Sequence, residues 1–255
     1  MSIIVRKLAG LLVFLYFILK RLDDNLYMEN IPTLADKISI SSLFEPGHSI
    51  AWEFLSQFTW LWEALPEIHD FILKAGASLN NAEYRVLPDN VWIHETATVA
   101  PTAYIGNSII IGAGAEVRHC AFIRGNAIIG NGAVVGNSTE LKNVILFDEV
   151  QVPHYNYIGD SILGYKSHMG AGSITSNLKS DYSLISVLCD NIRIDTNLKK
   201  FGAILGDKVE IGCNSVLNPG SIIGANVTVY PLSYVRGFVP ANSIYKKQGE
   251  IVEKH

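Results

Sequence analysis

Cysteine is scarce in this chain of 255 residues, which contains only Cys120, Cys189 and Cys213. The number is odd, and the three residues show neither C-x-x-C spacing nor the Cys and His spacing of a zinc site. This usage is typical of thiols that are kept reduced, and it predicts a cytoplasmic location.

Positive charge is also limited. The chain has 20 Lys and Arg against 24 Asp and Glu, a formal net charge of -4, and no run in which basic residues alternate with aromatic ones. Such a chain has no general attraction to polyanions. We therefore expect no nucleic-acid partner.

Long hydrophobic runs are absent apart from one at residues 8–19, which two basic residues precede and two follow. A helix of that length would reach about 18 Å against a hydrocarbon core of roughly 30 Å, and no small-residue cleavage site follows the run. Residues 1–27 therefore form a segment apart, and three interpretations stay open. They are a docked helix, an in-plane membrane anchor, which we do not favour, and sequence upstream of a true start at Met28.

A six-residue period of aliphatic residues runs through most of the chain. It continues unbroken over nine positions, resumes after each of two five-residue steps, and returns after residue 203. Its members are Ile93, Val99, Ile105, Ile111, Val117, Ile123, Ile129, Val135, Leu141, Leu146, Val152, Ile158, Leu163, Met169, Leu205, Ile211, Leu217, Ile223, Val229 and Val235. A period of six matches no helix, and because it is even it suits short strands separated by turns. The pattern predicts the stacked coils of a solenoid over residues 91–240.

Small residues accompany this period. Gly often follows the aliphatic residue and a small residue often comes four places after it, as in IGAGAEV and IGNGAVV. Gly permits the unusual φ of a corner, and a small side chain fits a tight turn. Three hexads in each coil predict a triangular prism, in which residues about 18 apart stack on the same side.

The segments outside the hexads have other patterns. Residues 28–90 carry helix-like apolar spacing, which predicts a helical cap over the open first coil, while their aromatic cluster leaves a partner site as the alternative. Residues 178–203 alternate apolar and polar residues about a DN turn signal, which predicts a β-hairpin or long loop leaving the prism. Such a loop either contacts a ligand or is a decorative insertion. Residues 241–255 form a C-terminal tail.

Polar side chains concentrate between residues 124 and 177, in the segments IRGNAIIGNGAVVGNSTELKN, VPHYNYIGDSILG and MGAGSITSN. Here the sequence resembles the acetyltransferase domain of bifunctional glucosamine-1-phosphate N-acetyltransferase/N-acetylglucosamine-1-phosphate uridyltransferase, over about residues 124–200 and more loosely to 240. The resemblance implies a mainly β, left-handed parallel β-helix that assembles as a homotrimer. It also implies acetyl transfer from acetyl-CoA to glucosamine-1-phosphate or galactosamine-1-phosphate, with no metal required, within UDP-N-acetylglucosamine biosynthesis.

The resemblance also implies the roles of individual residues. His154 is the general base, and Tyr157 helps to hold the sugar. Arg124 and Lys142 bind the sugar phosphate, and Glu140 supports them.

Three further positions follow from the same resemblance. Asn177 lies near the acetyl donor, Lys200 reaches in after the excursion, and His168 in SHMGAG lies near the expected amine. His168 stands where the better-known relatives have Asn, so donor and acceptor preferences could differ. Pro153 replaces a Gly and stiffens the approach to His154.

The residue types suit this chemistry. A protonated amine must lose a proton before it attacks a thioester, and an imidazole with an ordinary pKa near 6.5 can accept that proton at neutral pH. The planar fork of Arg124 and the point charge of Lys142 can clamp a phosphate. Because the two are 18 residues apart, we expect both to point at one place. The plain alternative is that His154 is a surface residue and that both charges are simply solvated.

The sequence argues against two other functions and leaves a third open. The sequence has no G-x-G-T-R-M-like nucleotide loop and no room for a nucleotidyltransferase domain ahead of the prism, so uridylylation is not supported. A zinc site of the kind found in some hexapeptide prisms would need His119, His154 and His168, but their gaps of 35 and 14 residues lack a close pair of ligands. A non-catalytic or regulatory binder of sugar nucleotides stays open as the second function.

Overall fold

The computed structural model describes residues 34–190 and 192–254. The chain divides into two compact units, Met1–Lys37 and Ile38–His255. In the first unit, the described residues 34–37 are helical. The apolar run at 8–19 and the question of a start at Met28 lie outside the described residues. Within those that are described, no helix has the length and apolar character needed to span a bilayer.

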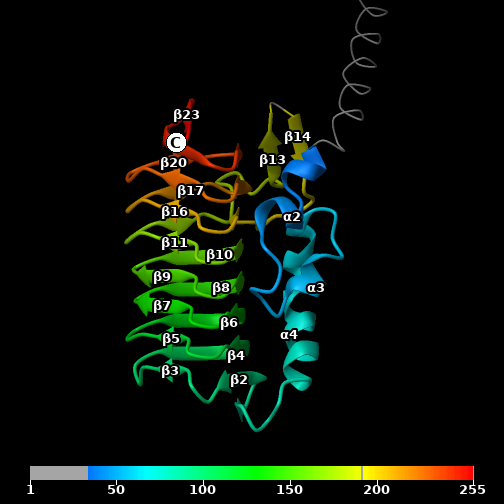
Figure 1. The fold of residues 1–255 in the computed structure, drawn as a ribbon, viewed down its shortest axis with the longest axis vertical. Coiled ribbons are helices and arrows are strands. Elements are labelled where there is room, and N and C mark those ends of the chain that lie inside the picture. Colours follow the sequence, from blue (N-terminus) through cyan, green and yellow to red (C-terminus); the bar gives the residue numbers. More distant parts are fainter. Residues whose placement is uncertain (1–33, 191, 255) are drawn as a thin grey trace, which may run out of the picture. The chain divides into compact units, whose positions relative to one another are not determined.

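The second unit is a parallel β-helix, as the six-residue period predicts (Figure 1). Each coil lies on the next in register, so that Ile105 is paired with Ile123 and Ile123 with Leu141. The aliphatic series forms its core, since every member except Val99 and Ile105, near the first coil, is buried. Burial of each such side chain contributes about 1.5–3 kcal/mol, which makes this axial stack the main source of stability.

The strands form two sheets and one separate hairpin. The first sheet contains β1 (Tyr84–Leu87), β2 (Val91–His94), β4 (Tyr104–Ile111), β6 (Phe122–Ile129), β8 (Glu140–Leu146), β10 (Tyr157–Leu163), β12 (Ile174–Thr175), β15 (Ala203–Leu205), β17 (Val216–Leu217), β18 (Ser221–Ile223), β20 (Tyr234–Val235) and β21 (Phe238–Val239). The second contains β3 (Thr98–Val99), β5 (Glu116–Val117), β7 (Val134–Asn137), β9 (Gln151–His154), β11 (His168–Met169), β16 (Glu210–Ile211), β19 (Thr228–Val229), β22 (Ser243–Lys247) and β23 (Glu250–Glu253).

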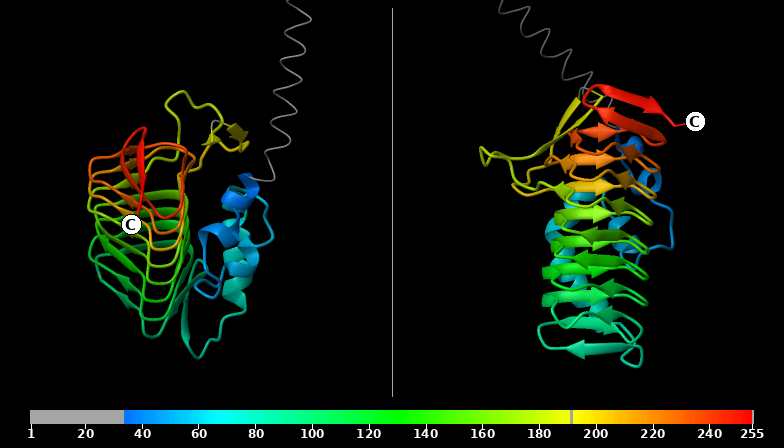
Figure 2. Two further views of the ribbon diagram at one scale, coloured as in Figure 1. Left: turned by 45° about the horizontal axis from the view of Figure 1, so that its top comes forward. Right: turned by 90° about the vertical axis from the view of Figure 1, so that its left-hand side faces the viewer.

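The first sheet bends at a corner, so the coils have three sides (Figure 2). The corner residues are Ser108, Asn126, Asn143 and Asp160, which all have φ between 47° and 55° and interrupt β4, β6, β8 and β10. Asn and Asp tolerate this left-handed conformation better than most residues. We call the strand segments before this corner, with β12, β17 and β20, the first side. The strand segments after the corner, with β15, β18 and β21, form the second side. The third side is the whole of the second sheet.

A helical layer covers the second side (Figures 1 and 2). It consists of α2 (Ile40–Leu43), α3 (Trp52–Leu55), the 3-10 helix η1 (Leu61–Glu67) and α4 (Ile68–Ala77). The outward position on this side is Ile in six coils, and each of these side chains is 0–1% exposed, namely Ile110, Ile128, Ile145, Ile162, Ile204 and Ile222. Two corner residues fix the layer in place, because Asn126 Oδ1 lies 3.0 Å from His69 Nδ1 and Asn143 Nδ2 donates to the Leu65 carbonyl at 3.0 Å.

The position of these helices differs from the predicted cap over the first coil. They run alongside several coils, with α4 packed on β4, β6 and β8, and the edge of β2 is instead paired with the antiparallel strand β1. The physical reason is the ladder of outward Ile residues, which has to be covered along the length of the prism.

The excursion between residues 178 and 202 contains an antiparallel hairpin of β13 (Ser186–Cys189) and β14 (Ile192–Asp195), which confirms the hairpin prediction. The C-terminal tail also forms a hairpin, because β22 continues the third side and β23 pairs antiparallel with it. Of the three cysteines, Cys189 is buried and Cys120 and Cys213 are exposed.

Candidate functional site

Four of the predicted site residues lie on the first side of three successive coils. Arg124 belongs to β6, Glu140 and Lys142 to β8, and Tyr157 to β10. Tyr157 is the direct neighbour of Glu140 in the parallel ladder. Arg124 Nη1 donates to Glu140 Oε1 at 2.9 Å, with both side chains partly exposed. The coil register therefore brings these side chains together, and Glu140 contacts Arg124 as expected of a supporting carboxylate.

The predicted stacking of Arg124 on Lys142 is wrong in register. The ladder between β6 and β8 shifts between Ile123 and Gly125, so Lys142 is the partner of Gly125. The coil of β8 is one residue shorter here than the coils of β4 and β6, so Arg124 has no partner in β8, as in a β-bulge. The aliphatic series records this shift, because its step from Leu141 to Leu146 is five residues whereas the paired step from Ile123 to Ile129 is six.

Lys142 is bound by a carboxylate that the sequence did not single out. Lys142 Nζ lies 3.0 and 3.1 Å from Asp160 Oδ1 and Oδ2, and the Asp160 side chain is only 6% exposed. Asn143 Nδ2 donates to Asp160 Oδ1 at 3.0 Å, and Asn177 Nδ2 donates to Asp160 Oδ2. A buried carboxylate is costly unless such donors surround it. Asp160 thus joins Lys142 and Asn177, and the sequence did not predict its place in this group.

Tyr157 lies beside this group. Its hydroxyl is positioned over Gly159, where an added Cβ would come within 2.6 Å of the hydroxyl and 2.8 Å of Asn177 Nδ2. Burial raises the pKa of Tyr157, and the negative charges of Asp160 and Glu140 raise it further. The phenol therefore stays protonated and can donate a hydrogen bond. We call Arg124, Glu140, Lys142, Tyr157, Asp160 and Asn177 the first-side cluster.

The charges of the first-side cluster balance. The cations of Arg124 and Lys142 each have one carboxylate partner, Glu140 and Asp160 respectively. A phosphate that entered would therefore share these cations with carboxylates already in place. Arg124 is the more available of the two, because its side chain is 46% exposed against 26% for Lys142.

His154 is on a different side of the prism. It ends β9, on the third side, and the chain then turns through Tyr155 at a φ of 52° before β10 begins. Its side chain is exposed, and its backbone N–H donates to Asn156 Oδ1 at 3.1 Å. Among residues 34–190 and 192–254, the ring makes no hydrogen bond or ion pair. One copy of the chain does not bring His154 into contact with Arg124 or Lys142.

The two remaining predicted residues are also outside the cluster. His168 lies in β11 on the third side, and its Nδ1 is 2.8 Å from Glu210 Oε2. Lys200 is exposed at the end of the excursion. In the described part of the chain, no three His, Cys, Asp or Glu side chains form a group that could hold a metal ion.

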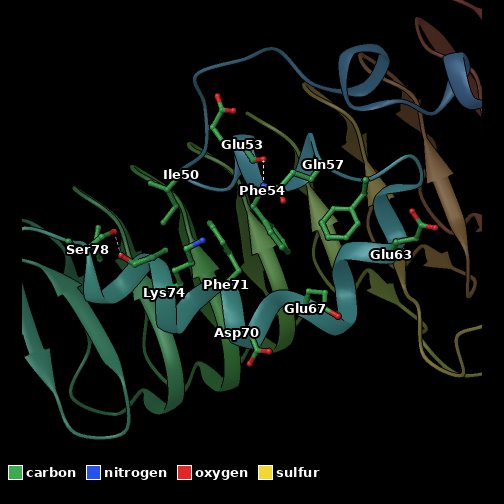
Figure 3. Close-up of a pocket in the computed structure, with 13 residues that line it drawn as sticks. Ile50, Glu53, Phe54, Gln57, Glu63, Glu67, Asp70, Phe71, Lys74 and Ser78 are labelled. Carbon is green, nitrogen blue, oxygen red and sulfur yellow. Dashed lines mark hydrogen bonds between the residues drawn. The ribbon is translucent and has the colours of Figure 1, made fainter.

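A hollow lies on the helical layer, away from the first-side cluster (Figure 3). It is a groove of about 840 Å³ with an apolar floor that includes Ile50, Phe54 and Phe71. Its rim includes Glu53, Glu67 and Asp70. Because these carboxylates repel a phosphate, the groove does not suit the predicted acceptor.

The period, the register and the corner geometry define the class: the chain is a hexapeptide-repeat β-helix protein. Residues 108–200 match the model of the GMPPB C-terminal domain family. The bifunctional protein GlmU of Methanococcus vannielii is 32% identical over 118 residues, which are 46% of this chain and 28% of that protein. A bifunctional sugar-1-phosphate nucleotidylyltransferase/acetyltransferase of Sulfurisphaera tokodaii is 32% identical over 109 residues, 43% of this chain and 27% of that protein. The chain thus spans less than a third of the length of these relatives.

Solved structures that the chain matches include the hexapeptide transferase family protein of Anaplasma phagocytophilum. It has a TM-score of 0.38 and 16% identity, over 65% of this chain and 79% of that one. The acetyltransferase domain of PglB from Neisseria gonorrhoeae, in complex with acetyl coenzyme A, has a TM-score of 0.27 and 19% identity, over 60% of this chain and 53% of that one. The matches to the family model and to the two bifunctional relatives show that the repeat region resembles the acetyltransferase domain of GlmU, as the sequence motifs indicated.

Proposed function

We propose that the protein is an acetyl-CoA-dependent N-acetyltransferase that acts on an amino-sugar 1-phosphate, either glucosamine-1-phosphate or galactosamine-1-phosphate. The observation that carries this proposal is the first-side cluster, in which Arg124, Lys142 and Tyr157 lie together next to Asn177. The relative from Sulfurisphaera tokodaii is by its name a sugar-1-phosphate nucleotidylyltransferase and acetyltransferase, which supports both the acceptor and the reaction.

The residues have the following roles in this proposal. Arg124 and Lys142 bind the phosphate, while Glu140 and Asp160 hold the two cations in place. Tyr157, whose raised pKa keeps its hydroxyl protonated, donates a hydrogen bond to the sugar. Such positioning reduces the entropy cost of bringing the amine to the thioester.

Acetyl transfer itself requires a base. His154 takes a proton from the sugar ammonium, and the neutral amine then attacks the carbonyl carbon of acetyl-CoA. The C–N bond of the amide forms and the C–S bond of the thioester breaks. The second proton of the amine nitrogen passes to the departing sulfur, so coenzyme A leaves as the thiol. Asn177 lies near the acetyl group and can donate a hydrogen bond to its carbonyl oxygen. This chemistry needs no metal.

The proposal requires a second copy of the chain. The exposed His154 and the first-side cluster occupy different sides of the prism, so a base from one copy would serve the cluster of a neighbour. A homotrimer supplies such a repeated interface, since a head-to-tail contact closes into a ring. His168 and Lys200 would then complete the cleft near the amine. The acetylated product would be used in the synthesis of UDP-N-acetylglucosamine in the cytoplasm.

Thiol release provides the test. The full chain is incubated with acetyl-CoA and either glucosamine-1-phosphate or galactosamine-1-phosphate, with the corresponding free amino sugars as controls. We expect release of coenzyme A that depends on the acceptor and is faster with the phosphate than with the free sugar. No release with any of the four acceptors would contradict the proposal.

A non-catalytic binder of sugar nucleotides is the second candidate, and two observations favour it. The His154 ring has no partner that would orient it within the described part of the chain, and His168 is bound to Glu210. This candidate predicts that wild type and His154→Ala are equally inactive on both phosphorylated acceptors while UDP-N-acetylglucosamine still binds. Turnover that is lost in His154→Ala would exclude it.

A further inference from the structure

Two apolar rows line the groove on the helical layer (Figure 3). Within each row the residues are four apart in the sequence, so they lie on one face of a helical segment. The first row is in the segment that contains α3, and the second is in α4 and just beyond it. The rows consist of Ile50, Phe54 and Phe58 and of Phe71, Ala75 and Leu79. We call this hollow the helical-layer groove.

Aromatic rings form the floor of the helical-layer groove. The rings of Phe54 and Phe71 are stacked with centroids 4.3 Å apart, and Phe58 meets Phe54 edge-on at 5.2 Å. These three side chains are only partly buried and Ile50 is 45% exposed, whereas Trp62 of the same helical layer is 2% exposed. An open apolar concavity with polar borders marks a binding surface rather than a core. The sequence left a partner site open for the aromatic residues of 28–90, and these members of that group lie at the surface.

The rim of the groove is acidic. Glu53, Glu63, Glu67 and Asp70 line it with a single cation, Lys74, so four carboxylates against one ammonium leave three negative charges in excess. All five side chains are exposed, and no ion pair joins any of the four carboxylates to a residue in the described part of the chain. Figure 3 shows Glu53 at one edge of the groove and Glu67 and Asp70 at the opposite edge. The groove therefore attracts positive charge along both edges.

The shape of the groove suits one α-helix. Two helical segments that meet through Phe54 and Phe71 leave a furrow between their side chains, and a third helix packs its own row of side chains into such a furrow. Since α4 has 10 residues, the furrow is about 15 Å long and matches about three turns of a helix. Apolar residues of that helix would cover the floor. Lys or Arg residues on its flanks would reach the rim, with their aliphatic stems over the apolar edges.

The charge of the rim argues against other occupants. A second copy placed face to face would set two acidic rims against each other, and nucleic acid or an anionic membrane surface would be repelled. A neutral apolar molecule would leave the carboxylates without a role. The groove also lies over the second side, whereas the proposed assembly brings the first and third sides of neighbouring copies together. It therefore stays open to a different protein.

We propose that the helical-layer groove binds a basic amphipathic α-helix of a partner protein. The apolar face of that helix covers Ile50 and Phe54, and its Lys or Arg residues pair with the carboxylates of Glu53, Glu67 and Asp70. The groove thus joins the chain to another protein through a surface that is separate from the first-side cluster. This inference does not depend on acetyl transfer, so either can fail without the other.

Fluorescence anisotropy of labelled peptides on the full chain tests the proposal. The probe is a synthetic helix of about 18 residues with Leu on one face and Lys elsewhere. One control peptide keeps the Leu positions and replaces Lys with Glu, and a second has the composition of the probe in an order that forms no apolar face. We expect the probe to bind about tenfold or more tightly than either control, and to weaken as salt is added. A probe that binds no more tightly than one of the controls would overturn the proposal.

Variants of the rim locate the binding. Glu67→Gln/Asp70→Asn is expected to weaken the probe about fivefold or more, whereas Lys74→Gln, which removes the cation, should strengthen it about twofold. The matched control is Glu95→Gln/Glu253→Gln, at two exposed carboxylates outside the groove, which should change the affinity less than about twofold. All of these side chains are exposed, so the variants should fold, and circular dichroism checks this. Equal losses in the two double variants, or a loss in Lys74→Gln, would overturn the assignment.

The apolar floor is tested in the same assay. Ile50→Ala should weaken the probe about threefold or more, while Ile251→Ala, at a side chain that is 39% exposed outside the groove, should stay within about twofold of wild type. Two further measurements distinguish other occupants. If Ile50→Ala lowers the mass of the assembly in sedimentation, a second copy fills the groove. If dodecanoate competes with the probe and binds more tightly, a small apolar ligand fills it. Either result, or an equal affinity of Ile50→Ala and Ile251→Ala, would overturn the proposal.

Discussion

The ammonium of Lys142 lies 3.0 and 3.1 Å from the two carboxylate oxygens of Asp160, whose side chain is 6% exposed. Asp160→Asn removes the negative charge and leaves a partly buried cation without its partner. We expect the free energy of unfolding to fall by about 3 kcal/mol, because breaking one half of a buried ion pair is costly. Urea unfolding measures this. The control is Asp195→Asn, in an exposed pair, which should cost less than about 1 kcal/mol. Equal stability of Asp160→Asn and wild type would contradict the account.

Close stacking of the coils predicts a severe effect at Gly136. An added Cβ would lie 1.5 Å from the Pro153 carbonyl oxygen in the next coil, and backbone atoms cannot move aside without separating the strands. Gly136→Ala should therefore cost about 3 kcal/mol or more in unfolding free energy.

The matched control for Gly136 is Gly114→Asn. Gly114 has a φ of +65° with no atom within 4 Å of an added Cβ, and Asn tolerates that conformation, as it does at Asn126. Thermal unfolding should show this variant close to wild type. A Gly136→Ala protein that melts at the same temperature as the control would refute the stacking argument.

Attachment of the helical layer depends on the ladder of outward Ile residues. Ile145→Ala is expected to lower the free energy of unfolding by about 2–5 kcal/mol, because the side chain is 0% exposed beneath the helices. Val86→Ala, at a side chain that is 53% exposed, should change it by about 0.5 kcal/mol or less. Chemical denaturation of both variants compares the two. If Ile145→Ala cost no more than Val86→Ala, the second side would not be a buried interface.

Tyr157 gives a prediction about pH. Its pKa is raised above 10 by burial and by the charges of Asp160 and Glu140, so the folded protein holds the phenolic proton at a pH where the unfolded chain has lost it. The stability linked to this group is therefore complete below about pH 10 and is lost as the pH rises through the folded pKa. Unfolding by urea at pH 9 and at pH 11 should show a larger loss in wild type than in Tyr157→Phe. Equal losses would mean that the environment of Tyr157 is not as described.

The coils could be predicted from the sequence because their cause is local and repeated. Each inward aliphatic residue fills the same position in each coil, so the period of six is visible without knowledge of the structure. The shift at Arg124 is also visible in the period, as the five-residue step from Leu141 to Leu146, but this step does not indicate which residue of the paired stretch of β6 lacks a partner.

The sequence does contain a signal for the position of the helices along one side of the prism. The outward residue is the middle one in each of the segments 109–111, 127–129 and 144–146. It is Ile in all three, and so it is as apolar as the inward residues on either side. Outward Ile in successive coils indicates a covered side rather than a covered end.

The candidate site could be predicted only in part, for a physical reason. Resemblance identified Arg124, Glu140, Lys142 and Tyr157, which one chain brings together. Asp160 was missed because its importance comes from hydrogen bonds across three coils, which no local pattern encodes. His154 stays a prediction, because its proposed partners belong to a neighbouring copy.

The turnover number of His154→Gln tests the central claim most directly. It is measured with acetyl-CoA and the preferred amino-sugar 1-phosphate, beside wild type and His94→Gln, a histidine at the end of β2. If His154 is the general base, its loss should lower kcat by about 100-fold or more while His94→Gln stays within about twofold of wild type. A His154→Gln enzyme that turns over at the wild-type rate would contradict the account.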